Sequence, residues 1–250
     1  MWQYRELIRN LTVADLKIRY QNTSLGFVWS ILNPFLFAIV LWFVFRNFFK
    51  QEENFSVNLL VGIMAWRFFL TGTNSSLYSI VGKPSLVTKV FIPREVLVLS
   101  NSLSVLISSL LEFLVLLPII FILMGSLPVT TLLFPIVHLI YFGFIFGAGL
   151  FLSALFVYFR DLNQVWDVLI NALFFCCPIV YPLSAVPAHL MPYYMLNPVT
   201  QYIVIYRQVL VGGDLPSPKG LIFLIGLGIA TCMLGSFVFS KLQRRFAEEI

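Results

Sequence analysis

Long apolar stretches recur along almost the entire chain, and each is long enough to cross a lipid bilayer as a helix. A helix rises 1.5 Å per residue, so about 20 mainly apolar residues span the ~30 Å hydrocarbon layer. Hydrophobic residues make up 60% of the 250 residues and charged residues only 11%, whereas soluble domains have roughly 45–50% and 25%. Such a chain cannot cover itself with polar side chains. We therefore predict an all-α integral membrane protein with a single transmembrane domain over residues 1–250.

Six segments meet the length criterion and predict six transmembrane helices, at residues 25–45, 57–79, 96–124, 129–159, 162–181 and 221–240. The third and fourth exceed a straight crossing, so we expect them to tilt or to project beyond the membrane. The latter half of the second is rich in polar residues, which should face protein rather than lipid. These residues are Thr71, Thr73, Asn74, Ser75 and Ser76.

Lys and Arg residues are unevenly divided between the two sides that six crossings create. With both termini in the cytoplasm, eleven lie on the cytoplasmic side and four on the outer side, namely Arg46, Lys50, Arg207 and Lys219. Cytoplasmic loops of membrane proteins are enriched in these residues, so the bias predicts cytoplasmic termini. It also accounts for the net charge of +5 without a nucleic-acid partner, because the cations form no dense stripe.

The first 24 residues precede the first predicted span and have the pattern of an amphipathic helix. Apolar residues recur at helical spacing, while Arg5, Arg9 and Lys17 fall on the other side. This pattern is typical of a helix lying at the membrane surface, here the cytoplasmic one. Thr12 and Asp15 have the spacing of a capping arrangement, which would divide the helix into two pieces.

Residues 182–220, between the fifth and sixth spans, also contain helix signals. Asn197 is a suitable N-cap, Pro198 suits the first helical position, and Gly212 and Gly213 end the apolar repeat that follows. Residues 188–194 predict a second, shorter helix. We expect the two pieces to form a re-entrant gate region at the outer face.

The residue pattern gives no indication of an enzyme. The sequence holds no G-x-x-x-x-G-K-[ST] phosphate loop, His138 and His189 stand alone, and the three cysteines lie in apolar runs without ligand spacing. We therefore predict no catalytic residue, metal site or cofactor in this chain. Any energy for its function must come from a partner or from a gradient.

Two ionisable residues near the middle of the predicted spans are candidates for an ion pair. Arg67 and Glu112 lie roughly 15 and 18 Å from the outer ends of the second and third spans by helix rise. Pairing would relieve the cost of burying two charges, so we favour a structural ion pair over a proton relay. On the fourth span, Gly143, Gly147 and Gly149 form a small-residue stripe that predicts close helix packing.

Tyrosines are concentrated near the predicted outer region: Tyr181, Tyr193, Tyr194, Tyr202 and Tyr206. Amphipathic rings can stack on sugar faces while their hydroxyls form hydrogen bonds. Anchoring at the membrane interface explains them equally well.

Several short strings, in this order along nearly the whole chain, resemble the permease of type-2 ATP-binding-cassette exporters, in the branch that exports polysaccharides and teichoic acids on lipid carriers. They are LKIRY at 16–20, SLG at 24–26 with Trp29, NP at 33–34, Lys89 with Phe91 and PRE at 93–95, FRD at 159–161, PI at 178–179, YP at 181–182, LNP at 196–198 and YR at 206–207.

The resemblance implies a homodimeric twelve-span channel in the cytoplasmic (inner) membrane. Two ATPase subunits, which hold ATP and magnesium, would drive export of a lipid-linked glycan of the undecaprenyl type, as in O-antigen export. The N-terminal helix and the loop at residues 80–95 would couple the channel to the ATPase. The residues expected in coupling are Arg19, Lys89, Pro93, Arg94 and Glu95. Those expected at the substrate path or gate are Trp29, Tyr181, Tyr193, Tyr194, Tyr202, Tyr206 and Arg207.

Other functions remain open from the sequence. A type-2 exporter of small hydrophobic drugs or lipids would have the same fold with a different cavity. A gradient-driven transporter would need an internal repeat and a titrating site at the midplane, and neither is convincing here.

Overall fold

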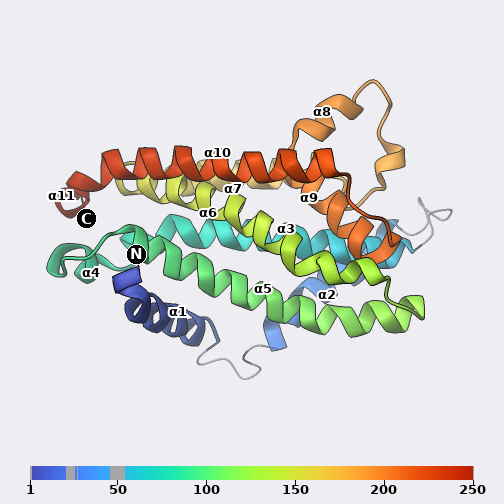
Figure 1. The fold of residues 1–250 in the computed structure, drawn as a ribbon, viewed down its shortest axis with the longest axis horizontal. Helices are drawn as coiled ribbons and strands as arrows, with labels where there is room; N and C mark the ends of the chain where they lie inside the picture. Colours follow the sequence, from blue (N-terminus) through green and yellow to red (C-terminus); the bar gives the residue numbers. More distant parts are fainter. Residues whose placement is uncertain (1, 21–25, 27, 46–53, 250) are drawn as a thin grey trace.

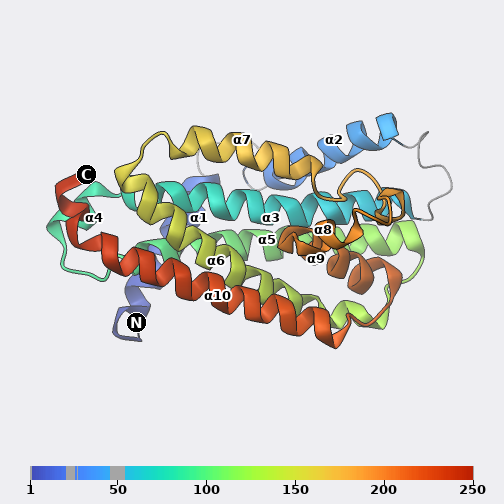
Figure 2. The same cartoon turned by 90° about the horizontal axis from the view of Figure 1, so that it is seen from above.

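Long apolar helices dominate the computed structural model, which describes residues 2–20, 26, 28–45 and 54–249, and no strand occurs among those residues. The principal helices run side by side along one axis (Figures 1 and 2). They are α2 (Val28–Phe45), α3 (Phe55–Val81), α5 (Glu95–Met124), α6 (Phe134–Tyr158), α7 (Leu162–Phe175) and α10 (Pro218–Leu242).

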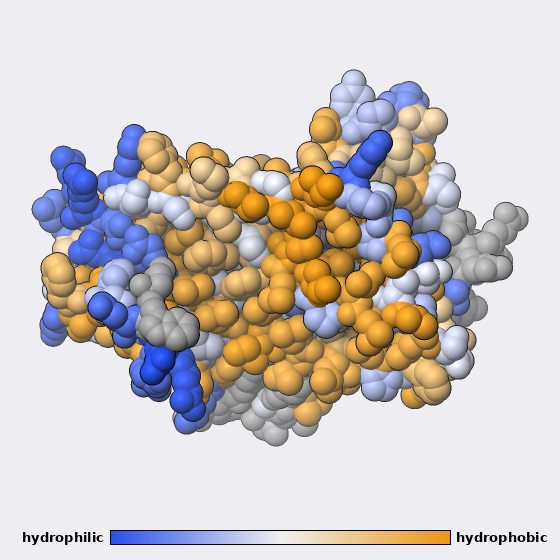
Figure 3. Space-filling view, in the orientation of Figure 1, coloured by the Kyte–Doolittle hydropathy of each residue, from blue (hydrophilic) through white to orange (hydrophobic). Residues whose placement is uncertain are grey.

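Four helical segments are long and apolar enough to cross a membrane: Phe55–Val81, Glu95–Met124, Val129–Tyr158 and Pro218–Glu249. The apolar helices Leu32–Phe45 and Leu162–Phe175 correspond to the first and fifth predicted spans but are shorter. Apolar residues cover the middle of the molecule in Figure 3, and hydrophilic residues gather toward its ends. This distribution is that of an integral membrane protein.

The fifth predicted span differs from the structure at its end. The prediction ran to Tyr181, but α7 stops at Phe175 after 14 residues, or about 21 Å of helix. Pro178 lacks a backbone N–H and disfavours helical geometry in the residue before it, so the helix ends ahead of it. The prediction for the first span began at Leu25, which lies outside the described residues, as do Arg46 and Lys50.

Helix α3 lies at the centre of the bundle, where it packs against α2, α5 and α6. Its polar latter half faces protein, as the sequence predicted, with Thr73 and Ser76 fully buried. The hydroxyls of Thr73 and Ser76 donate to the backbone carbonyls of Phe69 and Gly72 at 2.8 and 2.7 Å. These bonds satisfy the hydroxyls inside the helix pair without requiring water.

Helices α6 and α10 approach most closely at two glycines. A Cβ added to Gly235 would lie 2.2 Å from the carbonyl oxygen of Gly147, and one added to Gly147 would lie 2.5 Å from the backbone nitrogen of Cys232. Only glycine permits such backbone contact. Gly149 is also tightly packed, beside Ser76, whereas a Cβ at Gly143 would meet open space.

Both termini lie at one end of the bundle (Figure 1), together with several short elements. These are η1 (Trp2–Tyr4), α1 (Arg5–Tyr20), α4 (Pro84–Lys89), η5 (Gln243–Arg245) and α11 (Phe246–Glu249). Helix α1 is continuous, so the predicted division into two pieces is wrong. Thr12 donates instead to the carbonyl of Ser100 at 3.2 Å, and Asp15 pairs with Lys83 at 2.8 Å. These contacts hold α1 against α5 and α4.

The opposite end carries η2 (Val129–Leu133), η3 (Leu183–Ala185), α8 (Met191–Leu196), α9 (Pro198–Arg207) and a π-helical turn, η4 (Gln208–Gly212). Asn197 caps α9 as predicted, its side chain accepting from the N–H of Val199 at 3.0 Å. The shorter helix α8 begins at Met191 rather than at Ala188. Helix α9 folds back against α3, α6 and α10, so most of its side chains are buried.

Candidate functional site

The loop predicted to couple to an ATPase projects at the end of the bundle that holds the termini. Helix α4 lies in its first half, and residues 90–92 follow without helix or strand before Pro93. Lys89 is exposed and the Phe91 ring is completely exposed, while Pro93 is half-buried. Lys83 fixes the start of α4 to Asp15 of α1 through a half-buried ion pair. The loop therefore presents Lys89 and Phe91 outward from a supported base.

Arg94 and Glu95 are partly buried, and both contact the segment that follows α10. The guanidinium of Arg94 donates to the backbone carbonyl of Gln243. The side chain of Gln243 donates to Oε1 of Glu95 at 2.7 Å. Both residues are thus hydrogen-bonded to Gln243, and their expected role in coupling stays a prediction.

Arg19 lies in the last turn of α1 and is partly buried, and its expected role in coupling stays a prediction. On α1, Asp15 pairs with Lys83 at the start of α4, and Leu11 packs against the core cluster that includes Val87 of α4.

Arg67 and Glu112 come together in the middle of the bundle, where α3 meets α5. Nη2 of Arg67 lies 3.9 Å from Oε1 of Glu112, and their side chains are 25% and 11% exposed. The geometry is that of a partly buried structural ion pair. It matches the pairing expected from the positions of the two residues along their helices.

One face of Arg67 opens on a cavity of about 300 Å³ between α2, α3 and α7. Its walls are mainly apolar and include several aromatic rings, with the amides of Asn33 and Asn171 among them. Phe37 of α2 and Phe174 of α7 pack with ring centroids 6.2 Å apart, which places these two helices side by side. The cavity is thus an apolar space that contains a few polar groups at membrane depth.

A polar stripe that the sequence prediction missed runs along α7 to this cavity. Gln164, Asp167 and Asn171 are all exposed, and their spacing of three and four residues puts them on one side of the helix. The signal was present in the sequence, since an acid and two amides at helical spacing are unusual in a membrane segment. Asp167 adds an ionisable group to Arg67 and Glu112.

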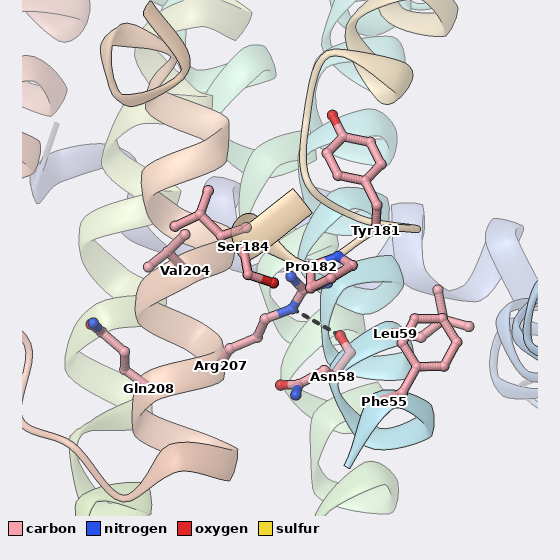
Figure 4. A pocket seen from close by; sticks show the side chains of 10 residues that line it. Phe55, Asn58, Leu59, Tyr181, Pro182, Ser184, Val204, Arg207 and Gln208 are labelled. Carbon is pink, nitrogen blue, oxygen red and sulfur yellow. Dashed lines mark hydrogen bonds between the residues drawn. The ribbon is translucent and has the colours of Figure 1, made fainter. Parts of the chain in front are cut away.

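A second pocket, of about 290 Å³, lies at the other end of the bundle between α3, α9 and the loop after α7 (Figure 4). Arg207 crosses it, donating from Nε to the carbonyl of Asn58 at 3.0 Å and from Nη2 to that of Ile179 at 2.9 Å. Gly62 makes room for the guanidinium, because a Cβ there would lie 2.9 Å from Nη2. Arg207 thus joins α9 to α3.

The predicted aromatic gate residues divide into two groups. Tyr193 is 70% exposed and Trp29 is 46% exposed. Tyr181 lines the pocket of Arg207, and its hydroxyl forms a hydrogen bond with the hydroxyl of Tyr194, the two oxygens lying 3.0 Å apart. These four rings are therefore exposed or partly exposed on the surface of the protein.

Tyr202 and Tyr206 are placed differently from the expectation that sugars stack on them. Both are fully buried. The ring of Tyr202 stacks on Tyr141 with centroids 4.0 Å apart, and the hydroxyl of Tyr206 lies 2.6 Å from Nδ1 of His138. Their repeat at helical spacing is the packing face of α9, and no sugar reaches them in this arrangement. Among the described residues, no group of His, Cys, Asp and Glu is placed to hold a metal ion.

The sequence profile described as ABC-2 type transporter matches residues 6–211. This chain belongs to the ABC-2 type transporter family. The match extends from α1 through the α4 loop to the outer helices, so it includes both ends of the bundle at which candidate sites occur.

Curated relatives of this ABC-2 transporter are similar over nearly their full length. An O-antigen export system permease protein RfbA of Klebsiella pneumoniae is 30% identical, over 97% of this chain and 94% of that protein. A protein of the same name from Myxococcus xanthus is 32% identical, over 100% and 97%. The polysialic acid transport protein KpsM of Escherichia coli is 22% identical, over 91% and 90%.

Two sets of contacts in this ABC-2 permease could not be inferred from the sequence. Gln243 and Phe246 contact the α4 loop from 148 and 152 positions away in the chain, and no local pattern marks such a contact. His138, which bonds Tyr206, appeared as a lone histidine in an apolar run. Such contacts depend on tertiary structure.

Proposed function

We propose that this chain is the membrane subunit of an ATP-driven exporter of an O-antigen-type polysaccharide. The observation that carries the proposal is the similarity, at 30–32% identity over nearly the entire chain, to proteins named O-antigen export permeases. A bundle of apolar helices with polar residues at its centre suits the transport of a polar substrate.

In this proposal the chain crosses the inner membrane six times, with both termini in the cytoplasm. Helices α2 and α7 supply the two crossings beyond the four longer helices, although α7 alone covers about 21 Å of the ~30 Å layer. The irregular residues 176–181 would cover the rest. Both termini lie at the same end of the bundle (Figure 1), as an even number of crossings requires.

Two copies would form the channel, and the polar stripe of α7 supports this. Gln164, Asp167 and Asn171 are exposed on a helix that lies at membrane depth. Lipid is an unfavourable neighbour for such groups, so they should face a second subunit or a polar path between subunits. Trp29 and Asn33 of the neighbouring helix α2 are exposed as well.

Energy would come from two ATPase subunits that bind ATP with magnesium and dock at the α4 loop. The exposed Lys89 and Phe91 offer a charged and an aromatic contact at the tip of that loop. The cargo in this proposal is a glycan on an undecaprenyl-type lipid. On α1, Arg5 and Arg9 are mostly exposed and would attract the lipid phosphates at the membrane surface.

A deletion of the gene for this chain tests the proposed cargo. We expect surface polysaccharide to disappear and lipid-linked glycan to accumulate inside the cell, and a plasmid copy of the gene to reverse both effects. Unchanged surface polysaccharide, with increased sensitivity to hydrophobic drugs, would contradict the proposal and favour a small-molecule exporter.

A further inference from the structure

The end of the chain, residues 241–249, lies against the α4 loop. We propose that this C-terminal segment is a positioning element for the loop, and that Gln243 and Phe246 fix the loop in the geometry needed for coupling. The inference rests on the proposed function, because it assumes that the α4 loop is where the ATPase acts.

Polar contacts join the C-terminal segment to the base of the loop. The Gln243 side chain donates to Glu95 at 2.7 Å, and its backbone carbonyl accepts from Arg94. Arg94 and Glu95 are the two residues at which the loop enters α5. A single residue of the C-terminal segment therefore binds both sides of this junction.

Phe246 adds an apolar contact to these polar ones. Its ring is completely buried and belongs to the same core cluster as Val87 of α4 and Leu97 of α5. The ring centroid lies 5.4 Å from that of Phe239 in α10 and 6.0 Å from the guanidinium carbon of Arg94. Phe246 is thus packed between the coupling loop and the last long helix.

The segment also contacts the end of α6 and the turn that follows. The Tyr158 hydroxyl donates to the carbonyl of Leu242 at 2.8 Å, and Arg160 donates to that of Glu249 at 3.4 Å. A groove of about 460 Å³ lies on the outside, where Gln243 and Ala247 line it together with the loop and Tyr4. The C-terminal segment is therefore itself held by α6 and by the turn that follows α6.

These contacts have a mechanical consequence. A displacement of the α4 loop by the ATPase must either break the contacts of Gln243 and Phe246 or move α10 with the loop. Because α10 packs along α6 through backbone contact at Gly235 and Gly147, it would carry α6 as well. The C-terminal segment thus makes the loop and two long helices respond together.

An exchange of donor and acceptor tests the proposal in the complex with the ATPase. Gln243→Glu puts a second carboxylate against Glu95, and Gln243→Met removes the hydrogen bond at similar volume. We expect either change to lower glycan export per ATP hydrolysed by about tenfold, as the loss of a hydrogen bond to a charged group allows. The double variant Glu95→Gln/Gln243→Glu restores the pair with reversed roles and should return export per ATP to within about twofold of wild type.

Glu248→Gln is the matched control, because Glu248 is exposed in the same segment. It should leave export per ATP unchanged. The proposal would be overturned if the Gln243→Met complex exported as much glycan per ATP as the wild type. It would also be overturned if the double variant exported no more glycan per ATP than Gln243→Glu. A lower yield of assembled complex with a normal ratio would also overturn it, since that result indicates a purely structural role.

A measurement on the permease alone separates this inference from the proposed function. Trypsin acts on exposed lysines, and Lys89 lies on the loop. We expect cleavage at Lys89 to be several times faster in Gln243→Met and normal in the double variant, because a released loop opens more often. If the wild-type complex failed to export glycan but this pattern held, only the proposed function would fall. Equal cleavage in all variants would overturn the positioning role.

Discussion

Nδ1 of His138 in α6 lies 2.6 Å from the hydroxyl oxygen of Tyr206 in α9. Both side chains are buried, and the imidazole stacks on Phe68 of α3 with ring centroids 4.2 Å apart. This hydrogen bond therefore joins α9 to α6, and the stacked ring of Phe68 adds α3 to the contact. The position of α9 depends on a polar contact within an aromatic cluster.

Tyr206→Phe should loosen α9 without creating a cavity. The change removes one hydroxyl and leaves Nδ1 of His138 without that partner, so we expect a loss of about 0.5–2 kcal/mol in stability. Thermal unfolding in detergent measures the loss. Tyr193→Phe, at an exposed position of α8, serves as the control and should leave stability unchanged. An equal effect of the two substitutions would show that the bond to His138 is not stabilising.

The ion pair of Arg67 and Glu112 predicts that reversing either charge alone lowers the stability of the protein, and that exchanging the two charges does not. Arg67→Glu and Glu112→Arg each place like charges 3.9 Å apart in a partly buried site. We expect each to destabilise the protein by about 1–3 kcal/mol, and the double variant to recover most of that loss. Thermal stability of the purified variants provides the measurement. A double variant as unstable as the sum of the two singles would exclude pairing.

The polar stripe of α7 predicts a loss of export without a loss of folding. Asp167→Leu removes an exposed charge, so the monomer should fold at least as well. Export per assembled complex should fall, by about tenfold if the stripe lies along the path of a polar glycan. Val168→Leu, an apolar change at an exposed neighbouring position, is the control. If the Asp167→Leu complex exported glycan at the wild-type level, the polar stripe of α7 would not lie along the export path.

Because α6 and α10 are in backbone contact, substitutions at different glycines of α10 should differ strongly in their effect on stability. Gly235→Leu forces the backbones apart, because even a Cβ would lie 2.2 Å from the carbonyl oxygen of Gly147. Gly226→Leu in the same helix meets open space. We expect the first to lower stability by about 1–3 kcal/mol or more and the second to be neutral. Similar melting temperatures for the two variants would contradict the packing described here.

Much of the fold could be predicted from local sequence signals. Asn197 and Pro198 marked the start of α9, and apolar length marked the long helices. The end of α7 was misjudged because hydropathy continues past Phe175, while Pro178 stops the helix. Composition describes the membrane environment well, but it does not describe backbone geometry.

The candidate site was less accessible to prediction. Arg67 and Glu112 were found because two charges at the same depth need partners. Tyr202 and Tyr206 were assigned to a sugar path because their residue type suits one, yet helical spacing also suits a buried face, and they are buried. The contacts of Gln243 join residues 148 or more positions apart. Only tertiary structure reveals such contacts.

The central claim is that this permease moves its cargo only with energy from an ATPase partner. The most direct measurement compares vesicles that contain the permease alone with vesicles that contain the permease and its ATPase, both loaded with lipid-linked glycan and ATP. We predict ATP hydrolysis and glycan translocation only in the second set, and neither when the phosphate-binding loop of the ATPase is inactivated. Translocation or ATP hydrolysis by the permease alone would contradict the claim.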